Sequence, residues 1–298
     1  MMKIVKILLI SVPLIIFLFS SCDKISAPYA LAKYGHVTDT VIDWDDTVNS
    51  EKRVLLEDYT GHTCQNCPAA AAIAHNQEAY YHGKLIVLAV HAGYYAEPGT
   101  GEFNIDLRTS AGEQWNSDFN IIAYPSGMID RKEFNGQQVL GSSEWVSDIA
   151  SIINQPPTLN MAMINTYDST SRIVNSAIYS QFLQSLAGSY TITVCVMEDS
   201  IISAQDSSNT VIQNYNFKDV LRGAINGPYG EILTNSVDPT LTYLGRFSIP
   251  INTAWVAKNC WILAFVSNSS SKEIFQAVKQ RVVSPKTVFF YPKGAKKR

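Results

Sequence analysis

The sequence predicts an α/β layer domain followed by an all-β sandwich, because the pattern of predicted secondary structure changes part-way along the chain. Between residues 51 and 155, short apolar segments rich in β-branched residues alternate with segments of helical spacing, as in a layered α/β structure. After Pro156 and Pro157, strand-like segments follow one another and are separated by Ser, Asn, Asp and Gly, as in an antiparallel sandwich. We therefore place the domain boundary at the double proline, with domains at 51–155 and 156–298.

The first domain is expected to alternate strands with helices. Strands are predicted at 54–56, 84–91 and 127–130, and helices at 67–81, 108–119 and 142–154. The first helix is Ala-rich, and the last places Trp145, Ile149 and Ile152 on one side. A long loop with glycines and prolines spans 92–106.

The second domain is expected to contain strands alone. They are predicted at 159–165, 176–182, 190–198, 241–249, 261–267 and 274–283. Turn-forming residues between them favour antiparallel connections.

Composition excludes several classes of function. The chain has 298 residues and a formal charge of −3, so it lacks the excess of basic residues that a nucleic-acid-binding protein usually has. A hydrophobic content of 46% excludes a mainly disordered chain. We predict no nucleic-acid partner and no cofactor.

The N-terminus has the features of an export signal. Lys3 and Lys6 precede an apolar segment at 7–19, which is too short to span a membrane and fits a signal peptide. Ser20 and Ser21 then lead to Cys22, a pattern that resembles a lipoprotein signal. We expect 1–21 to be removed, Cys22 to be lipidated, and 22–50 to act as a tether leading to the first domain. An ordinary secretory signal with a coincidental cysteine is the alternative.

A Cys-x-x-Cys motif lies between the first predicted strand and the Ala-rich helix. Cys64 would lie near the helix N-terminus, where unpaired amides and the helix dipole stabilise a thiolate. Cys67 would lie one turn inside and could attack a mixed disulfide. In a strand–helix context this pattern is typical of a thioredoxin-like redox site.

Three interpretations of these cysteines stay open. They form a redox-active dithiol, a static disulfide that fixes the start of the helix, or a copper or zinc site. In the last case the ligand set would be His62, Cys64, Cys67 and His91.

Two further features match thioredoxins. Asp58 lies six residues before Cys64, at the spacing of the buried carboxylate that assists proton transfer in that family, although strict strand alternation leaves Glu57 as its competitor. Tyr124, Pro125 and Ser126 precede a strand and resemble the cis-proline loop that shapes the substrate groove, with Pro125 as the cis residue.

Two histidines could lower the pKa of the reactive thiol. His62 lies two residues before Cys64, and His91 ends the second predicted strand. An imidazolium near a cysteine favours its thiolate, although each histidine could equally be an ordinary loop or surface residue.

The whole chain resembles a Gram-negative lipoprotein family named after a twenty-eight-kilodalton outer-membrane protein. The resemblance rests on residues 57–68 (EDYTGHTCQNCP), 124–127 (YPSG) and 220–227 (VLRGAING), with AFV at 264–266 and FQA at 275–277. It implies a thioredoxin-like domain followed by an immunoglobulin-like sandwich at the outer membrane, on a face that the sequence leaves open. It implies no particular reaction.

Two functions from different classes therefore compete. The first is thiol–disulfide exchange on extracytoplasmic proteins, with Cys64 attacking and Cys67 resolving. The second is a non-catalytic surface-binding or adhesion lipoprotein on the same scaffold, which fits the Thr63 that stands where thioredoxins carry Trp. Cys195 and Cys260 lie on predicted sandwich strands, either paired or as buried free thiols.

Overall fold

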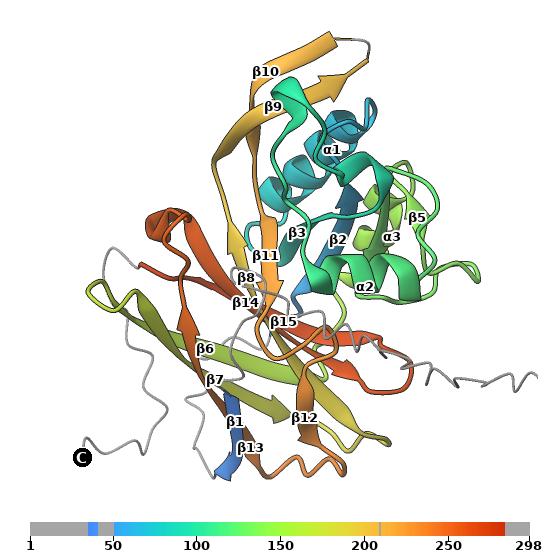
Figure 1. Cartoon of the computed structure of the whole chain (residues 1–298). Helices are drawn as coiled ribbons and strands as arrows, with labels where there is room; N and C mark the ends of the chain where they lie inside the picture. The colour runs from blue at the N-terminus through green and yellow to red at the C-terminus, as the bar shows by residue number, and fades with distance from the viewer. Residues whose placement is uncertain (1–34, 41–50, 209, 284–298) are drawn as a thin grey trace, which may run out of the picture.

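The computed structural model describes residues 35–40, 51–208 and 210–283. The protein is a mixed α/β structure in which a large β-rich body carries three α-helices within the described residues (Figure 1). The helices are α1 (Cys67–Tyr80), α2 (Ser110–Asp118) and α3 (Trp145–Ile152). None of them combines the length and the hydropathy that a membrane crossing requires.

One large sheet runs through both halves of the chain. Its order is β15–β14–β8–β11–β3–β2–β4–β5, and β12 also pairs with β8. The strands from the first half are β2 (Val54–Thr60), β3 (Leu85–His91), β4 (Ser126–Ile129) and β5 (Leu140–Gly141). Those from the second half are β8 (Tyr190–Glu198), β11 (Val220–Ala224), β12 (Glu231–Thr234), β14 (Cys260–Asn268) and β15 (Ile274–Arg281).

Two smaller sheets complete the body. Four antiparallel strands in the order β1–β13–β7–β6 form one of them. They are β1 (Gly35–Thr40), β6 (Leu159–Asp168), β7 (Ile173–Phe182) and β13 (Thr242–Pro250). The strands β9 (Ile201–Ser207) and β10 (Thr210–Phe217) form a separate hairpin, which rises beside α1 in Figure 1. The sequence predicts neither this hairpin nor β1, which lies inside the segment expected to be a tether.

The two halves meet where β11 joins β3. The pair is parallel, with Val220 opposite Ala89, and the amide of Ala89 donates to the carbonyl of Asp219 at 2.8 Å. On the other side, β2 is parallel to β3 and antiparallel to β4. Strands from beyond the double proline therefore extend the sheet that holds the Cys-x-x-Cys loop.

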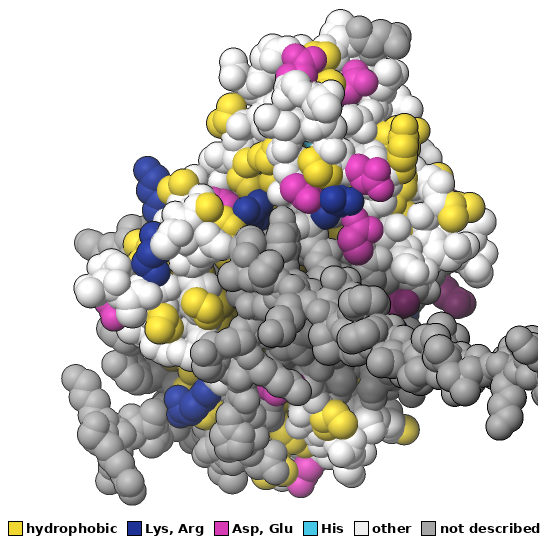
Figure 2. Space-filling model, in the orientation of Figure 1, with side chains coloured by type: hydrophobic (Ala, Val, Ile, Leu, Met, Phe, Trp, Pro, Cys, Tyr) yellow, Lys and Arg dark blue, Asp and Glu magenta, His cyan; other side chains and the backbone are white. Residues whose placement is uncertain are grey.

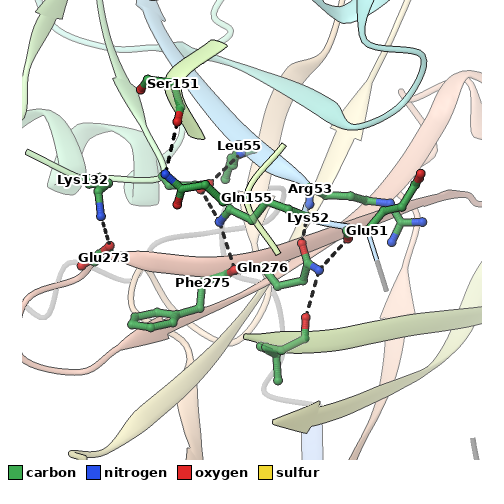
Figure 3. A network of polar contacts seen from close by, with 12 residues as sticks. Glu51, Lys52, Arg53, Leu55, Lys132, Ser151, Gln155, Glu273, Phe275 and Gln276 are labelled. Atoms are coloured by element: carbon green, nitrogen blue, oxygen red, sulfur yellow. Dashed lines mark hydrogen bonds and ion pairs between the residues drawn. The ribbon is translucent and has the colours of Figure 1, made fainter. Parts of the chain in front are cut away.

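A polar network fastens the start of β2 to β15 (Figure 3). The Gln276 side chain accepts from the amide of Arg53 at 2.6 Å and donates to the carbonyl of Glu51 at 2.9 Å. Nearby, Lys52 Nζ donates to the carbonyl of Phe275 at 3.1 Å. These contacts join residues more than two hundred positions apart, so the halves are held by partly buried polar contacts as well as by the shared sheet.

The first half of the sheet is covered on both faces. Leu56 packs with Ala70 of α1 and Trp145 of α3 in one apolar cluster. On the opposite face, Tyr59 and Trp115 of α2 belong to a second cluster that includes residues of β8 and β14. Every residue of β2 and β3 is buried as a result, as expected of parallel strands inside a layered sheet.

Candidate functional site

The Cys-x-x-Cys motif forms a disulfide at the start of α1. The Cα atoms of Cys64 and Cys67 lie 5.4 Å apart, and the amide of Cys64 donates to the carbonyl of Gly61 at 3.1 Å. Cys67 begins the helix and Pro68 follows it in the first turn, where a missing N–H costs nothing. The side chains of Cys64 and Cys67 are only 3% and 2% exposed, so both sulfur atoms lie beneath the surface.

Asp58 lies beneath the disulfide. It lines a cavity of about 20 Å³ together with Cys67, His75 and His91, a volume that suffices for roughly one water molecule. The side chain is 2% exposed, and its Oδ1 has no hydrogen-bond partner among the described residues. Burial raises the pKa of Asp58 to about 7, against a smaller opposing effect of His75. The structure thus brings together the carboxylate and the second cysteine of the predicted site.

Glu57, the predicted competitor of Asp58, is also fully buried, but on the other face of β2. Its carboxylate accepts from Arg131 Nε at 2.8 Å and from an Arg131 terminal nitrogen at 2.7 Å. The Arg131 guanidinium lies 4.8 Å from the centroid of Trp115 and 5.3 Å from that of Phe265. The expectation that only one of the two carboxylates points into the core is therefore wrong, because apolar layers cover both faces of this strand.

Both predicted histidines lie near the disulfide, and both are buried. His91 lines the cavity and contacts Phe217 edge-on at 5.4 Å, while His62 stacks on Phe103 at 6.0 Å. Burial lowers the pKa of His91 to about 3 and also lowers that of His62, because desolvation disfavours the imidazolium. Both rings are therefore neutral at pH 7, so neither is the imidazolium that could lower the pKa of the reactive thiol.

The predicted proline loop lies at the start of β4. The Tyr124–Pro125 peptide bond is cis, as predicted. The hydroxyl of Tyr124 donates to Asn116 Oδ1, and its ring contacts that of Tyr95 at 5.8 Å. Ser126 is buried, and its hydroxyl donates to the carbonyl of Ala123 at 2.7 Å, so that this side chain stabilises the turn itself.

The β9–β10 hairpin covers the disulfide loop, and the sequence gives no sign of it. Gln205 is 2% exposed, and its amide donates to the carbonyl of Cys64 at 3.0 Å and to that of Gly61 at 3.3 Å. The amide of Asp206 donates to the carbonyl of His62 at 2.8 Å. Tyr215, Phe217 and Lys218 from the hairpin and its end line the cavity beside Asp58. A segment about 140 residues away in the sequence thus closes the site.

The other two cysteines in the part of the chain that the structure describes are free and belong to different apolar clusters. Cys195 packs in the cluster with Trp115, and Cys260 in the cluster formed by residues of the large sheet and the four-stranded sheet. Burial raises the pKa of both thiols, that of Cys260 to about 12. Both thiols are therefore protonated at neutral pH and behave as small apolar groups.

A group of potential metal ligands lies at the edge of the site. His75, Glu78 and Asp219 have ligand atoms within 4.8 Å of one another. Lys279 Nζ already donates to the carboxylates of Glu78 and Asp219, at 2.6 and 3.1 Å. The cluster is a charge network, and it shares no residue with the ligand set of His62, Cys64, Cys67 and His91 that the sequence suggests.

The profile of the family described as outer membrane protein Omp28 matches residues 112–286. The match covers more than half of the chain and includes the proline loop, the hairpin and the strands of the second half. The chain belongs to the Omp28 family. This membership confirms the resemblance seen in the sequence and places the protein at the outer membrane.

Several solved structures are similar to this Omp28 family member, and the first two that follow share its fold. HBP35 of Porphyromonas gingivalis aligns with 84% of this chain and 80% of its own, at 14% identity and a TM-score of 0.57. A protein of Agrobacterium tumefaciens aligns with 80% of this chain and 98% of its own, at 11% identity and a TM-score of 0.50. A domain of the outer membrane lipoprotein Omp28 from Porphyromonas gingivalis aligns with 42% of this chain and 88% of its own, at 19% identity and a TM-score of 0.29. No curated protein matches the chain.

The predicted lipid anchor lies outside the described residues. Cys22 and the preceding signal segment precede the first described strand, Gly35–Thr40. Lipidation therefore stays a prediction from the sequence.

Proposed function

We propose that this Omp28 family member carries out thiol–disulfide exchange on proteins of the cell envelope, with Cys64 and Cys67 as the reacting pair. The observation that carries the proposal is the position of Asp58, a buried carboxyl with an unpartnered oxygen in the cavity that Cys67 also lines. A pKa of about 7 means that this carboxyl is partly protonated at neutral pH. It can therefore give a proton to the Cys67 sulfur, or take one from it, as the disulfide opens and closes.

The exchange proceeds from the oxidised state as follows. A substrate thiolate attacks Cys64 Sγ, the Cys64–Cys67 bond breaks, and Cys67 leaves as a thiolate that takes the proton of Asp58. A second substrate thiolate attacks the substrate sulfur of the mixed disulfide and displaces Cys64. The substrate has then lost two electrons and carries a disulfide, while in the protein Cys64 is left as a thiolate, Cys67 as a thiol and Asp58 as a carboxylate. In the reverse direction Cys64 attacks a substrate disulfide and Cys67 resolves it.

The surrounding residues have supporting roles in this proposal. Tyr124, Pro125 and Ser126 shape the turn against which a substrate would lie, and neutral His62 and His91 keep the surroundings of the sulfur atoms poorly hydrated. The first domain, at 51–155, is thioredoxin-like in this proposal. The support is that β2, α1 and β3 form a parallel strand–helix–strand unit with the cysteines at the start of the helix. The second, at 156–298, is an immunoglobulin-like sandwich that binds a partner or orients the site.

Lipidation of Cys22 would hold this body at the membrane surface. Several acyl chains bind a bilayer firmly, at about 0.8 kcal/mol for each buried methylene. The protein substrate and the membrane lipid are therefore the two partners in this proposal.

One observation favours a second candidate function. Both sulfur atoms are buried, and the hairpin covers their loop, as befits a static disulfide in a non-catalytic surface-binding or adhesion lipoprotein. Protease treatment of intact cells tests the surface location that this alternative requires. A protein that is fully protected in intact cells would count against it.

Reduction of insulin by the full-length protein in detergent separates the two candidates. We expect the wild-type protein to accelerate insulin reduction by a small dithiol, and the Cys64→Ser variant to show only the background rate. Cys195→Ala is the matched control, because it removes a buried thiol outside the site. Equal rates for the wild-type protein and Cys64→Ser would leave the static disulfide as the role of this pair.

A further inference from the structure

Three tyrosine rings form a row beside the disulfide loop, in which Tyr94 and Tyr95 are exposed and Tyr124 is partly buried. Tyr94 is 76% exposed and contacts Tyr95 edge-on at 5.4 Å, and Tyr95 contacts Tyr124 edge-on at 5.8 Å. We call Tyr94, Tyr95 and Tyr124 the tyrosine ladder. Ile122, two residues before Tyr124, is 84% exposed, so the segment that carries Tyr124 presents a further apolar side chain to solvent. Exposed large side chains gathered at one place mark a binding surface more often than single exposed residues do.

The tyrosine ladder is held in place by contacts to its backbone and to one of its hydroxyls. The amide and hydroxyl of Thr63 donate to the carbonyl of Tyr95, at 3.1 and 2.9 Å. A side chain at Gly61 would collide with the backbone of Tyr95, so the close approach of the two loops requires glycine there. These interactions attach Tyr95 directly to the Cys-x-x-Cys loop, and the hydrogen bond from Tyr124 to Asn116 attaches Tyr124 to α2. A ligand would therefore meet rings that are already in position, which lowers the entropic cost of binding.

The surroundings of the ladder are acidic. Between positions 92 and 125 the sequence has five acidic residues and a single basic one, Arg108. Arg108 is already paired with Asp106, through two contacts of 3.0 and 3.1 Å. Glu97 directly follows the short helix that carries Tyr94, and Glu113 accepts from the amide of Gly93 at 3.2 Å. Neither Glu97 nor Glu113 forms a salt bridge within the described residues.

The space-filling view also shows more acidic than basic side chains in this region. Figure 2 shows acidic side chains gathered on the upper part of the molecule, among hydrophobic ones, with few basic side chains between them. This is the region that the loop after β3 and helix α2 occupy in Figure 1. The surface therefore complements a ligand that is cationic and partly apolar.

We propose that the tyrosine ladder, with Glu97 and Glu113, binds an arginine or lysine side chain of an extended polypeptide. An aromatic face attracts a cation, and the neighbouring carboxylates supply the counter-charge. Arginine suits the site best, because its flat guanidinium stacks on aromatic rings and forms paired hydrogen bonds with carboxylates. The apolar surface at Ile122 would contact the rest of the segment. This inference goes beyond the proposed redox function and does not depend on it, because the surface is formed in the oxidised protein.

Fluorescence anisotropy of labelled peptides tests the inference. The full-length oxidised protein in detergent is titrated against a cysteine-free, six-residue peptide of alternating arginine and alanine, and against the same peptide with glutamate in place of arginine. We expect the arginine peptide alone to bind, and its affinity to fall as salt is raised from 50 to 500 mM. Equal binding of both peptides, or no binding of either, would overturn the proposal.

Matched variants locate the binding. Tyr94→Ala should weaken the arginine peptide about two- to fivefold, as expected for the loss of an exposed cation–π contact, and adding Glu97→Gln should weaken it further. Tyr80→Ala is the control, because Tyr80 is 70% exposed and contacts Tyr81 edge-on at 4.9 Å, but lies on α1 outside the acidic segment. The same loss in Tyr94→Ala and Tyr80→Ala would contradict the proposed location. If tetramethylammonium displaced the arginine peptide at a concentration equal to that of the peptide, the site would bind small cations rather than a polypeptide, and the proposal would be wrong.

Discussion

Replacing Asp58 with asparagine should make the oxidised protein more stable above neutral pH. Burial raises the pKa of Asp58 from an ordinary value of 3.8 to about 7 in the folded state. The folded state therefore holds its proton more tightly than the unfolded state does. The stability linked to this proton is fully present below pH 3.8 and is lost as the pH rises through about 7. A shift of about three units at 1.36 kcal/mol each amounts to a penalty of roughly 4 kcal/mol above pH 7.

The measurement compares urea unfolding of the wild-type protein and Asp58→Asn at pH 5 and pH 8. At pH 5 about 2 kcal/mol of the penalty is already present, so the advantage of the variant should grow by roughly 2 kcal/mol between the two pH values. His75, Tyr215 and His91, which face the carboxyl, remain in both proteins, as does Asp219, whose pKa is raised to about 6. A stability difference that does not change with pH would refute the account of Asp58.

Two further changes test the packing around the site. Arg131→Met leaves the Glu57 carboxylate buried without its partner, and should lower the free energy of unfolding by about 3–5 kcal/mol. Replacing Glu57 and Arg131 together by apolar residues should cost much less, and equal losses would contradict a buried ion pair. Gln205→Ala removes the amide that holds the hairpin to the Cys64 carbonyl, so a small dithiol should reduce the disulfide faster, as followed by alkylation of the released thiols. An unchanged rate would show that the hairpin does not control access.

The first half of the fold could be predicted because its signals are local. The Ala-rich helix, the β-branched strand before His91 and the Cys-x-x-Cys spacing each act over a few residues. They place α1 and β3 within a residue or two of their observed bounds. The six-residue spacing of Asp58 from Cys64, which matches that of thioredoxins, also identifies the carboxylate that lies in the cavity.

The contacts that close the site could not be predicted, because they depend on distant segments. The β9–β10 hairpin is rich in Ser, Gln and Asn and lacks the apolar alternation that marks a half-buried strand. Its role follows from Gln205, whose partners lie more than 140 residues earlier. Likewise, the burial of Glu57 follows from Arg131 and the apolar layer over it, and strand alternation alone does not reveal that both faces of β2 are covered.

Trapping of a mixed disulfide on Cys64 is the most direct test of the central claim. The Cys67→Ser variant leaves Cys64 free to attack and removes the residue that would resolve the product. When this variant is mixed with a disulfide-containing protein such as insulin, mass spectrometry should find a covalent adduct at Cys64, which a reductant releases. The Cys64→Ser variant should form no adduct. Absence of the adduct from Cys67→Ser, or an equal amount on both variants, would contradict the assignment of Cys64 as the attacking thiol.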